Sequence, residues 1–221
     1  MSCRVGQTAE VGQMSNWSRR DFLIAGAATV VLSACGNTKS GAPTGSLIDA
    51  VDPEVAAREA LRRKAGGGKT TAKITAAPTT VSIGGKEVET WAFGERPGDG
   101  AIRAKAGELI EASFVNNLTS ENTIHWHGIA LRNNMDGVHD LTQAAVKAGE
   151  SFTYKFTAPD PGTYWFHPHK GLELDRGLYA PLIIEDPDEP SAADVDVTLV
   201  LDDWLDGYSR TQTQVLTELR E

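Results

Sequence analysis

Short apolar runs separated by turn residues make up the chain from about Lys73 onward, and this pattern restricts the fold more than any other feature of the sequence. Glycine and proline mark the breaks, as in Gly84-Gly85 and Asp160-Pro161-Gly162. The runs predict strands at residues 79–83, 87–93, 109–116, 123–131, 151–156, 162–167, 177–185 and 194–202. Many short strands at this spacing are typical of an antiparallel sandwich or barrel. We therefore expect an all-β domain over residues 73–190.

Residues 1–35 have the features of an export signal. Ser18-Arg19-Arg20 precedes an apolar run at residues 22–34, and this arrangement resembles a twin-arginine signal. The run is too short to span a bilayer comfortably. It ends in Leu32-Ser33-Ala34-Cys35-Gly36, which resembles a bacterial lipobox. These residues predict an exported protein, periplasmic or at the cell surface, with a lipid anchor at Cys35. A plain cleaved signal and a buried helix are the alternatives.

Two segments flank the predicted strands. Residues 36–72 are expected to form a tether with a short helix, because residues 36–47 are rich in Gly, Ser, Thr and Pro. Asp52-Pro53 can begin the helix, which would end near Lys64. Residues 191–221 are expected to hold the last strand and a closing helix with Ser209 as its N-cap, leading toward a further domain.

Charge and cysteine content exclude several kinds of site. The net charge is −9, which argues against a nucleic-acid partner because phosphates would repel the protein. The two cysteines, Cys3 and Cys35, both lie in the leader. The domain itself therefore has no disulfide, no zinc–thiolate site and no cysteine nucleophile. It also has no blue-copper centre, which needs a thiolate ligand.

Four of the five histidines form two His-x-His pairs, His125 with His127 and His167 with His169. Residues two apart on a strand face the same side, so each pair projects two imidazoles together while Trp126 faces away. Pro168 cannot donate a ladder hydrogen bond, so the second pair is expected at a sheet edge or strand end. If the two strands are neighbours, four rings converge, and a metal ion offsets the cost of burying them. Imidazole sites suit copper or zinc, and intrinsic affinity favours Cu²⁺. The alternative is ordinary surface or core histidines.

A series of motifs occurs in an order and spacing that point to one family. They are His125-Trp126-His127-Gly128, Met135-Asp136-Gly137, Thr142-Gln143, Gly162-Thr163-Tyr164-Trp165-Phe166-His167-Pro168-His169 and Gly177-Leu178-Tyr179-Ala180-Pro181. Together they resemble the first cupredoxin domain of multicopper oxidases of the laccase and bilirubin-oxidase type. Weaker likeness continues to Asp202-Asp203-Trp204. The resemblance implies a cupredoxin-like Greek-key β-sandwich with copper as its cofactor.

The resemblance also implies a role for each histidine. His125 would bind the type-2 copper of a trinuclear cluster, and His127, His167 and His169 would bind the paired type-3 coppers. Such a cluster reduces dioxygen to water while a reducing substrate, which the sequence does not identify, is oxidised.

Other residues near these motifs have more than one interpretation. Asp136 matches an acidic position near the cluster that assists proton delivery, and it is our candidate catalytic residue; the alternative is a turn residue before Gly137. Trp126 and Trp165 are expected in the core, where they fix the ligand strands. His139 belongs to neither pair and is expected to be an exposed loop residue.

The family's cluster needs a second set of histidines from a later domain, and the sequence has no histidine after His169. The chain ends at Glu221, where the resemblance places the start of the next domain. Three hypotheses follow. The chain is part of an oxidase, truncated or completed by missing cupredoxin domains in cis or in trans. It is a stand-alone extracytoplasmic copper-binding module without turnover. Or it is a non-functional remnant with an exposed domain interface.

Overall fold

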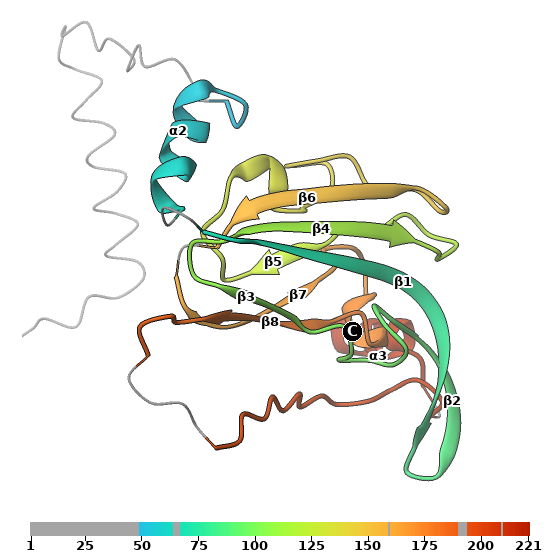
Figure 1. The fold of residues 1–221 in the computed structure, drawn as a ribbon. Coiled ribbons are helices and arrows are strands. Elements are labelled where there is room, and N and C mark those ends of the chain that lie inside the picture. Colours follow the sequence, from blue (N-terminus) through green and yellow to red (C-terminus); the bar gives the residue numbers. More distant parts are fainter. Residues whose placement is uncertain (1–48, 64–66, 159, 190–193, 209) are drawn as a thin grey trace, which may run out of the picture. The chain divides into compact units, whose positions relative to one another are not determined.

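The computed structural model describes residues 49–221 apart from 64–66, 159, 190–193 and 209 (Figure 1). Its elements are α2 (Pro53–Arg62), β1 (Lys69–Ile83), β2 (Lys86–Ala92), β3 (Ile102–Lys105), β4 (Leu109–Asn116), β5 (His125–His127), η1 (Asn133–Met135), β6 (Ser151–Thr157), β7 (Gly162–His167), η2 (Leu174–Arg176), β8 (Ala180–Glu185) and α3 (Gln212–Arg220). None of the helices in the described part is long and apolar enough to cross a membrane. The predicted export signal and the tether at 36–47 lie outside the described residues.

Two four-stranded sheets form the domain. One has the strand order β2-β1-β4-β6 and the other has the order β3-β8-β7-β5. Figure 1 shows them as two layers, with β6, β4 and β1 in one and β5, β7, β8 and β3 in the other. Along β4 every second residue is buried, which is the pattern of a strand with one face toward the core. The predicted all-β sandwich is confirmed.

Two strand pairs depart from the antiparallel arrangement that the turn spacing suggested. Residues 69–76 of β1 pair parallel with β4, and residues 77–83 then pair antiparallel with β2. β3 and β8 are also parallel. Strand direction depends on how each connection crosses between the sheets, and an apolar repeat within one strand carries no information about it.

Aromatic side chains fill the core directly behind the histidine strands. Trp126 on β5 is fully buried, with its ring centroid 5.3 Å from that of Phe166 on β7 and 4.8 Å from that of Phe156 on β6. Tyr154 is equally buried, and its hydroxyl accepts a 2.8 Å hydrogen bond from the Ile124 N–H. Burial raises the pKa of the Tyr154 phenol, so this group stays neutral. The residue before His125 is thus tied to the opposite sheet.

The individual strands differ from the predictions in several places. Of the strand predicted at 123–131, only His125–His127 forms a strand, β5. β3 was not predicted, because Arg103 and Lys105 make its sequence polar; its buried residues are Ile102 and Ala104. β1 starts ten residues earlier than the predicted strand at 79–83. Residues 194–202 form no strand in the described structure. They have the expected apolar alternation, but a strand also requires a neighbouring strand for its backbone hydrogen bonds.

The two flanking helices are present. α2 starts at Pro53 after Asp52, as predicted, and ends at Arg62, but the Asp52 side chain makes no capping hydrogen bond in the described structure. The closing helix α3 begins at Gln212, and Thr211 caps it. Its capping box joins Thr211 and Gln214, each side chain bonding the other's backbone N–H. Ser209, the predicted cap, lies outside the described residues.

Candidate metal centre

β5 and β7 are neighbours, which brings the two histidine pairs together. The strands are antiparallel, with His125 opposite His167 and His127 opposite Trp165. β7 ends at His167, so His169 lies just beyond the strand, as Pro168 predicted. The histidine pairs were expected to converge only if their two strands are neighbours, and β5 and β7 are neighbours. Trp126 points into the core, so the opposite face of β5 carries the imidazoles.

Three of the histidines bring their ligand atoms together in one cluster that could hold metal. One ligand atom from each of His125, His127 and His167 lies within 4.8 Å of the others. His127 Nδ1 is 3.0 Å from His167 Nε2. Two nitrogens that bind one ion at about 2 Å each cannot be more than about 4 Å apart, so this pair fits a common metal. His169 lies beside the group, with its ring centroid 4.5 Å from that of His125.

Backbone carbonyls orient two of these rings. His125 Nδ1 donates to the Asp136 carbonyl oxygen at 2.8 Å, and His167 Nδ1 donates to the Pro168 carbonyl oxygen at 2.9 Å. A ring whose Nδ1 carries the hydrogen leaves Nε2 with its lone pair free for a metal. These two carbonyl groups were not predicted, and nothing in the side-chain pattern could have identified them.

Gly137 allows the Asp136 carbonyl to approach His125. Its φ is +77°, a left-handed conformation that favours glycine. A Cβ at this position would lie 1.7 Å from the Ile124 carbonyl oxygen. The turn can therefore pack on the start of β5 only with glycine here. The carboxylate of Asp136 also lies close, with Oδ1 3.4 Å from His125 Nδ1.

Burial favours the neutral imidazole at His167 and His169, and the neutral form is the one that binds metals. Burial, reinforced by the neighbouring histidines, lowers the pKa of His167 to about 4. Burial also lowers the pKa of His169, with His125 as the next cause. Protons therefore compete weakly with a metal ion at neutral pH. His127 and His169 are exposed, so the cluster opens onto the surface of the domain.

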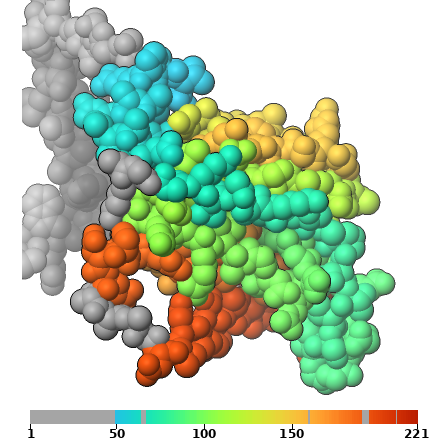
Figure 2. Space-filling model, viewed as in Figure 1, coloured from blue at the N-terminus to red at the C-terminus, as the bar shows by residue number. Residues whose placement is uncertain are grey.

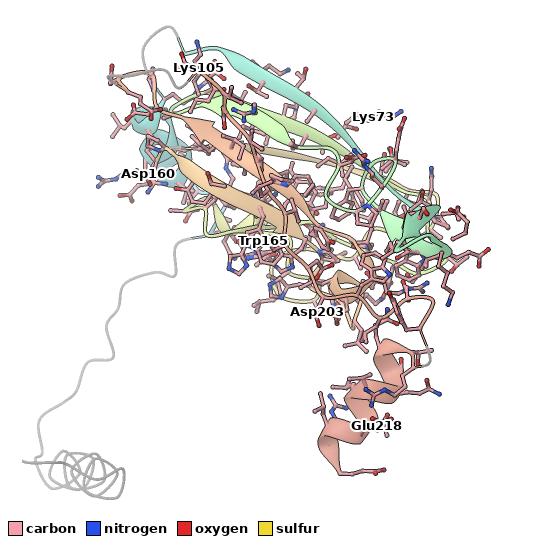
Figure 3. All side chains as sticks on the ribbon, turned by 90° about the horizontal axis from the view of Figure 1, so that it is seen from below. Lys73, Lys105, Asp160, Trp165, Asp203 and Glu218 are labelled. Carbon is pink, nitrogen blue, oxygen red and sulfur yellow. The ribbon has the colours of Figure 1, made fainter. Side chains whose placement is uncertain are left out.

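Trp165 does not lie in the core, which corrects the prediction. Its ring stacks on those of His167 and His127, with centroids 4.2 and 4.8 Å apart. It also lines an open cavity of about 480 Å³ with Tyr179 and Leu199. Figure 3 shows it on the same side of the domain as Asp203. The signal was available in the sequence, since Trp165 and His167 are two residues apart on one strand and so share a face.

His139 also differs from its prediction. Its side chain is partly buried rather than exposed, and its Nδ1 lies 3.0 Å from Asp140 Oδ2. It is not one of the three histidines whose ligand atoms converge. It remains a loop residue outside both histidine pairs, as expected.

The sandwich and its clustered imidazoles define a cupredoxin-like metal-binding domain, and comparison with known proteins gives the family. A profile of the multicopper oxidase family matches residues 75–189. The multicopper oxidase MmcO of Mycobacterium tuberculosis is 41% identical over 206 residues, covering 93% of this chain and 40% of that protein. Copper resistance protein A of Escherichia coli is 37% identical over 135 residues, covering 60% and 22%. The chain belongs to the multicopper oxidase family.

Solved structures agree with this assignment. A crystal structure of a multicopper oxidase from Pseudomonas thermotolerans matches with a TM-score of 0.54 and 34% sequence identity. The match covers 55% of this chain and 31% of that one. The sequence here thus spans less than half the length of the relatives that it matches.

Proposed function

We propose that this domain supplies four histidine ligands, His125, His127, His167 and His169, to a trinuclear copper cluster that reduces dioxygen to water while a reducing substrate is oxidised. The observation that carries the proposal is the 3.0 Å separation of His127 Nδ1 and His167 Nε2 in a member of the multicopper oxidase family. An all-imidazole donor set without a thiolate suits copper.

Each ring has a proposed place in the cluster. His125 would hold the type-2 copper, and His127, His167 and His169 would hold the type-3 pair. When bound, the copper ions supply the electron transfer to dioxygen. The described residues orient the donors: the carbonyl groups of Asp136 and Pro168 accept from His125 and His167, so that Nε2 of each ring carries no hydrogen.

Asp136 is the proposed proton donor of the site. Its Oδ1 lies 3.4 Å from His125 Nδ1, and its side chain is 31% exposed. A carboxylate with this access can take a proton from solvent at Oδ1 and pass it toward the dioxygen site. The turn that Gly137 permits holds the carboxylate in this place.

Further cupredoxin domains, in cis or in trans, would complete the enzyme. Two features support this. His127 and His169 are exposed, so ligands from elsewhere can reach the cluster. An apolar stripe at residues 195–201 is also exposed, with exposed fractions of 74% at Val195, 66% at Val197, 79% at Leu199 and 93% at Leu201. Uncovered apolar residues in a row are typical of a surface that packs against another domain. The oxidised substrate would be determined by those domains.

A second candidate function is copper binding without turnover. It is favoured by the convergence of three ligand atoms within 4.8 Å on this chain alone. A stand-alone module would hold copper outside the cytoplasm.

Either function fits export by the twin-arginine route with Cys35 as a lipid anchor, which we also propose, on the sequence of residues 18–36. Mass spectrometry of the exported protein with and without Cys35→Ala tests the anchor.

Copper titration of the purified chain tests the ligand assignment. We compare the unmodified protein with His127→Ala and His167→Ala, and with His139→Ala as a control that removes the fifth histidine. Affinity comes from calorimetry and nitrogen coordination from electron paramagnetic resonance. Each ligand variant should weaken Cu²⁺ binding more than about 100-fold, above the usual loss from outer-shell changes. His139→Ala should bind as the unmodified protein does.

Oxygen uptake then separates the two functions. Copper binding without oxygen consumption, even beside the remaining cupredoxin domains and a phenolic reductant, would favour the module. Consumption that His127→Ala abolishes would support the oxidase. Unchanged copper affinity in both ligand variants would overturn the assignment.

A further inference from the structure

Helix α2 contacts the domain through one acidic side chain. Glu59 Oε2 accepts from Arg132 Nε at 2.6 Å, and Arg132 Nη2 bonds the same oxygen. Glu59 Oε1 accepts from the backbone N–H of Thr157 at the end of β6, at 3.0 Å. The Glu59 and Arg132 side chains are only 13% and 28% exposed. Unlike an exposed surface pair, this ion pair is therefore partly shielded from water and holds a defined geometry.

The rest of the helix adds little apolar contact. None of its residues is buried. Arg62 Nη1 donates to the Ala130 carbonyl oxygen at 2.8 Å, which adds a second polar contact to the same loop. Figure 2 shows α2 in blue against the green and yellow parts of the domain. Polar bonds from two side chains, Glu59 and Arg62, thus join the helix to residues 130–132.

Those residues lead directly to the metal centre. Arg132 is the N-cap of η1, and its carbonyl oxygen accepts from the Met135 N–H at 3.0 Å. The Asp136 N–H donates to the Asn133 carbonyl oxygen at 3.1 Å, which closes the turn. Asp136 then presents its own carbonyl to His125 Nδ1. One short turn therefore connects the Arg132 guanidinium to the group that orients His125.

We propose that Glu59 of α2 is a positioning residue for the metal centre: by holding Arg132, it fixes the η1 turn and with it the carbonyl that sets the ring of His125. For copper, this inference rests on the proposed function. The orientation of the His125 ring does not depend on the proposed function, because the hydrogen bond from His125 Nδ1 to the Asp136 carbonyl forms without metal. Helix α2, which precedes the sandwich in sequence, therefore helps to orient a ligand of the metal centre.

The test uses three variants: Glu59→Gln, Arg132→Gln, and the double variant that carries both changes. Glu54→Gln is the control. Glu54 is a matched control because its 3.8 Å ion pair with Arg58 lies on the same helix and is exposed. Two readouts are taken on the whole chain. In the metal-free protein, ¹⁵N NMR reports which nitrogen of His125 carries the hydrogen. With Cu²⁺, calorimetry reports affinity, and thermal unfolding checks the fold.

We expect Glu59→Gln to mix the two tautomers of His125 and to weaken Cu²⁺ binding about tenfold, the lower end for outer-shell changes. The double variant should do no more than either single variant, because both act through one ion pair. Glu54→Gln should change neither readout. A lower unfolding temperature with an unchanged His125 tautomer and unchanged affinity would overturn the proposal and leave α2 a purely structural helix. If the unmodified chain bound no copper while the tautomer responded, the proposed function would fail and the positioning role would stand.

Discussion

His125 and His167 are paired residues across the β5–β7 ladder, and their ring centroids lie 5.4 Å apart. Each ring also donates Nδ1–H to a backbone carbonyl outside the ladder, at Asp136 and at Pro168. Strand pairing places the two rings opposite each other, and the two carbonyls decide which nitrogen each one presents. The metal centre thus depends on a loop and a strand end as much as on its ligands.

Gly137→Ala should break the turn that orients His125. The new Cβ would collide with the Ile124 carbonyl oxygen at 1.7 Å, and φ of +77° is strained for alanine. We expect a loss of about 3 kcal/mol or more in the free energy of unfolding, measured with urea. Gly149→Ala is the control, because φ is +78° there and nothing lies within 4 Å of the Cβ. Gly149→Ala should lower the free energy of unfolding only by the backbone strain, about 1–2 kcal/mol. Equal losses in the two variants would mean that the Gly137 turn relaxes freely.

Trp126→Ala and Trp165→Ala should separate folding from metal binding. Trp126 is fully buried among aromatic rings, so its loss should cost about 3–5 kcal/mol. Trp165 is only partly buried and stacks on two histidines. Its removal should cost less than about 2 kcal/mol but weaken Cu²⁺ binding about tenfold. Urea unfolding and copper titration measure the two effects. A Trp165→Ala protein with unchanged copper affinity would show that the stacking is incidental.

Glu173 should make the domain less stable as the pH rises. Only 7% of this residue is exposed, Oε1 accepts from Ser120 Oγ, and Oε2 has no hydrogen-bond partner among the residues that the structure describes. Burial raises its pKa above the ordinary 4.5. The unfolded chain therefore releases this proton at lower pH than the folded one. Its contribution to stability is fully present below pH 4.5 and is lost as the pH rises through the folded pKa.

Glu173→Gln tests this, since it removes the charge and keeps the shape. The variant should be more stable than the unmodified protein by about 1 kcal/mol at pH 8, and the advantage should disappear near pH 4. Urea unfolding across this pH range is the measurement. A constant difference at all pH values would contradict the assigned ionisation.

Several features of the protein could be predicted from local sequence. The two-residue repeat placed His125 and His127 on one face and Trp126 on the other, because successive side chains of a strand alternate whatever its neighbours are. Gly84 and Gly85, with φ of +60° and +82°, form the turn between β1 and β2 that their sequence predicted. Pro53 and Asp52 likewise predicted the start of α2. Each of these depends on a residue and its nearest neighbours in the chain.

Tertiary structure decided what local sequence could not. β3 is a strand because β8 pairs with it, whereas residues 194–202, with a better strand pattern, have no neighbouring strand in the described part of the chain. The pairing of His125 with His167 depends on β5 and β7 being adjacent. The carbonyl that orients His125 comes from a turn held by Glu59, far away in sequence. Side-chain alternation and turn chemistry are local properties, so the sequence alone determines them. Strand partners, register and backbone contacts to the metal centre join distant segments, and only the packing of the whole domain selects among them.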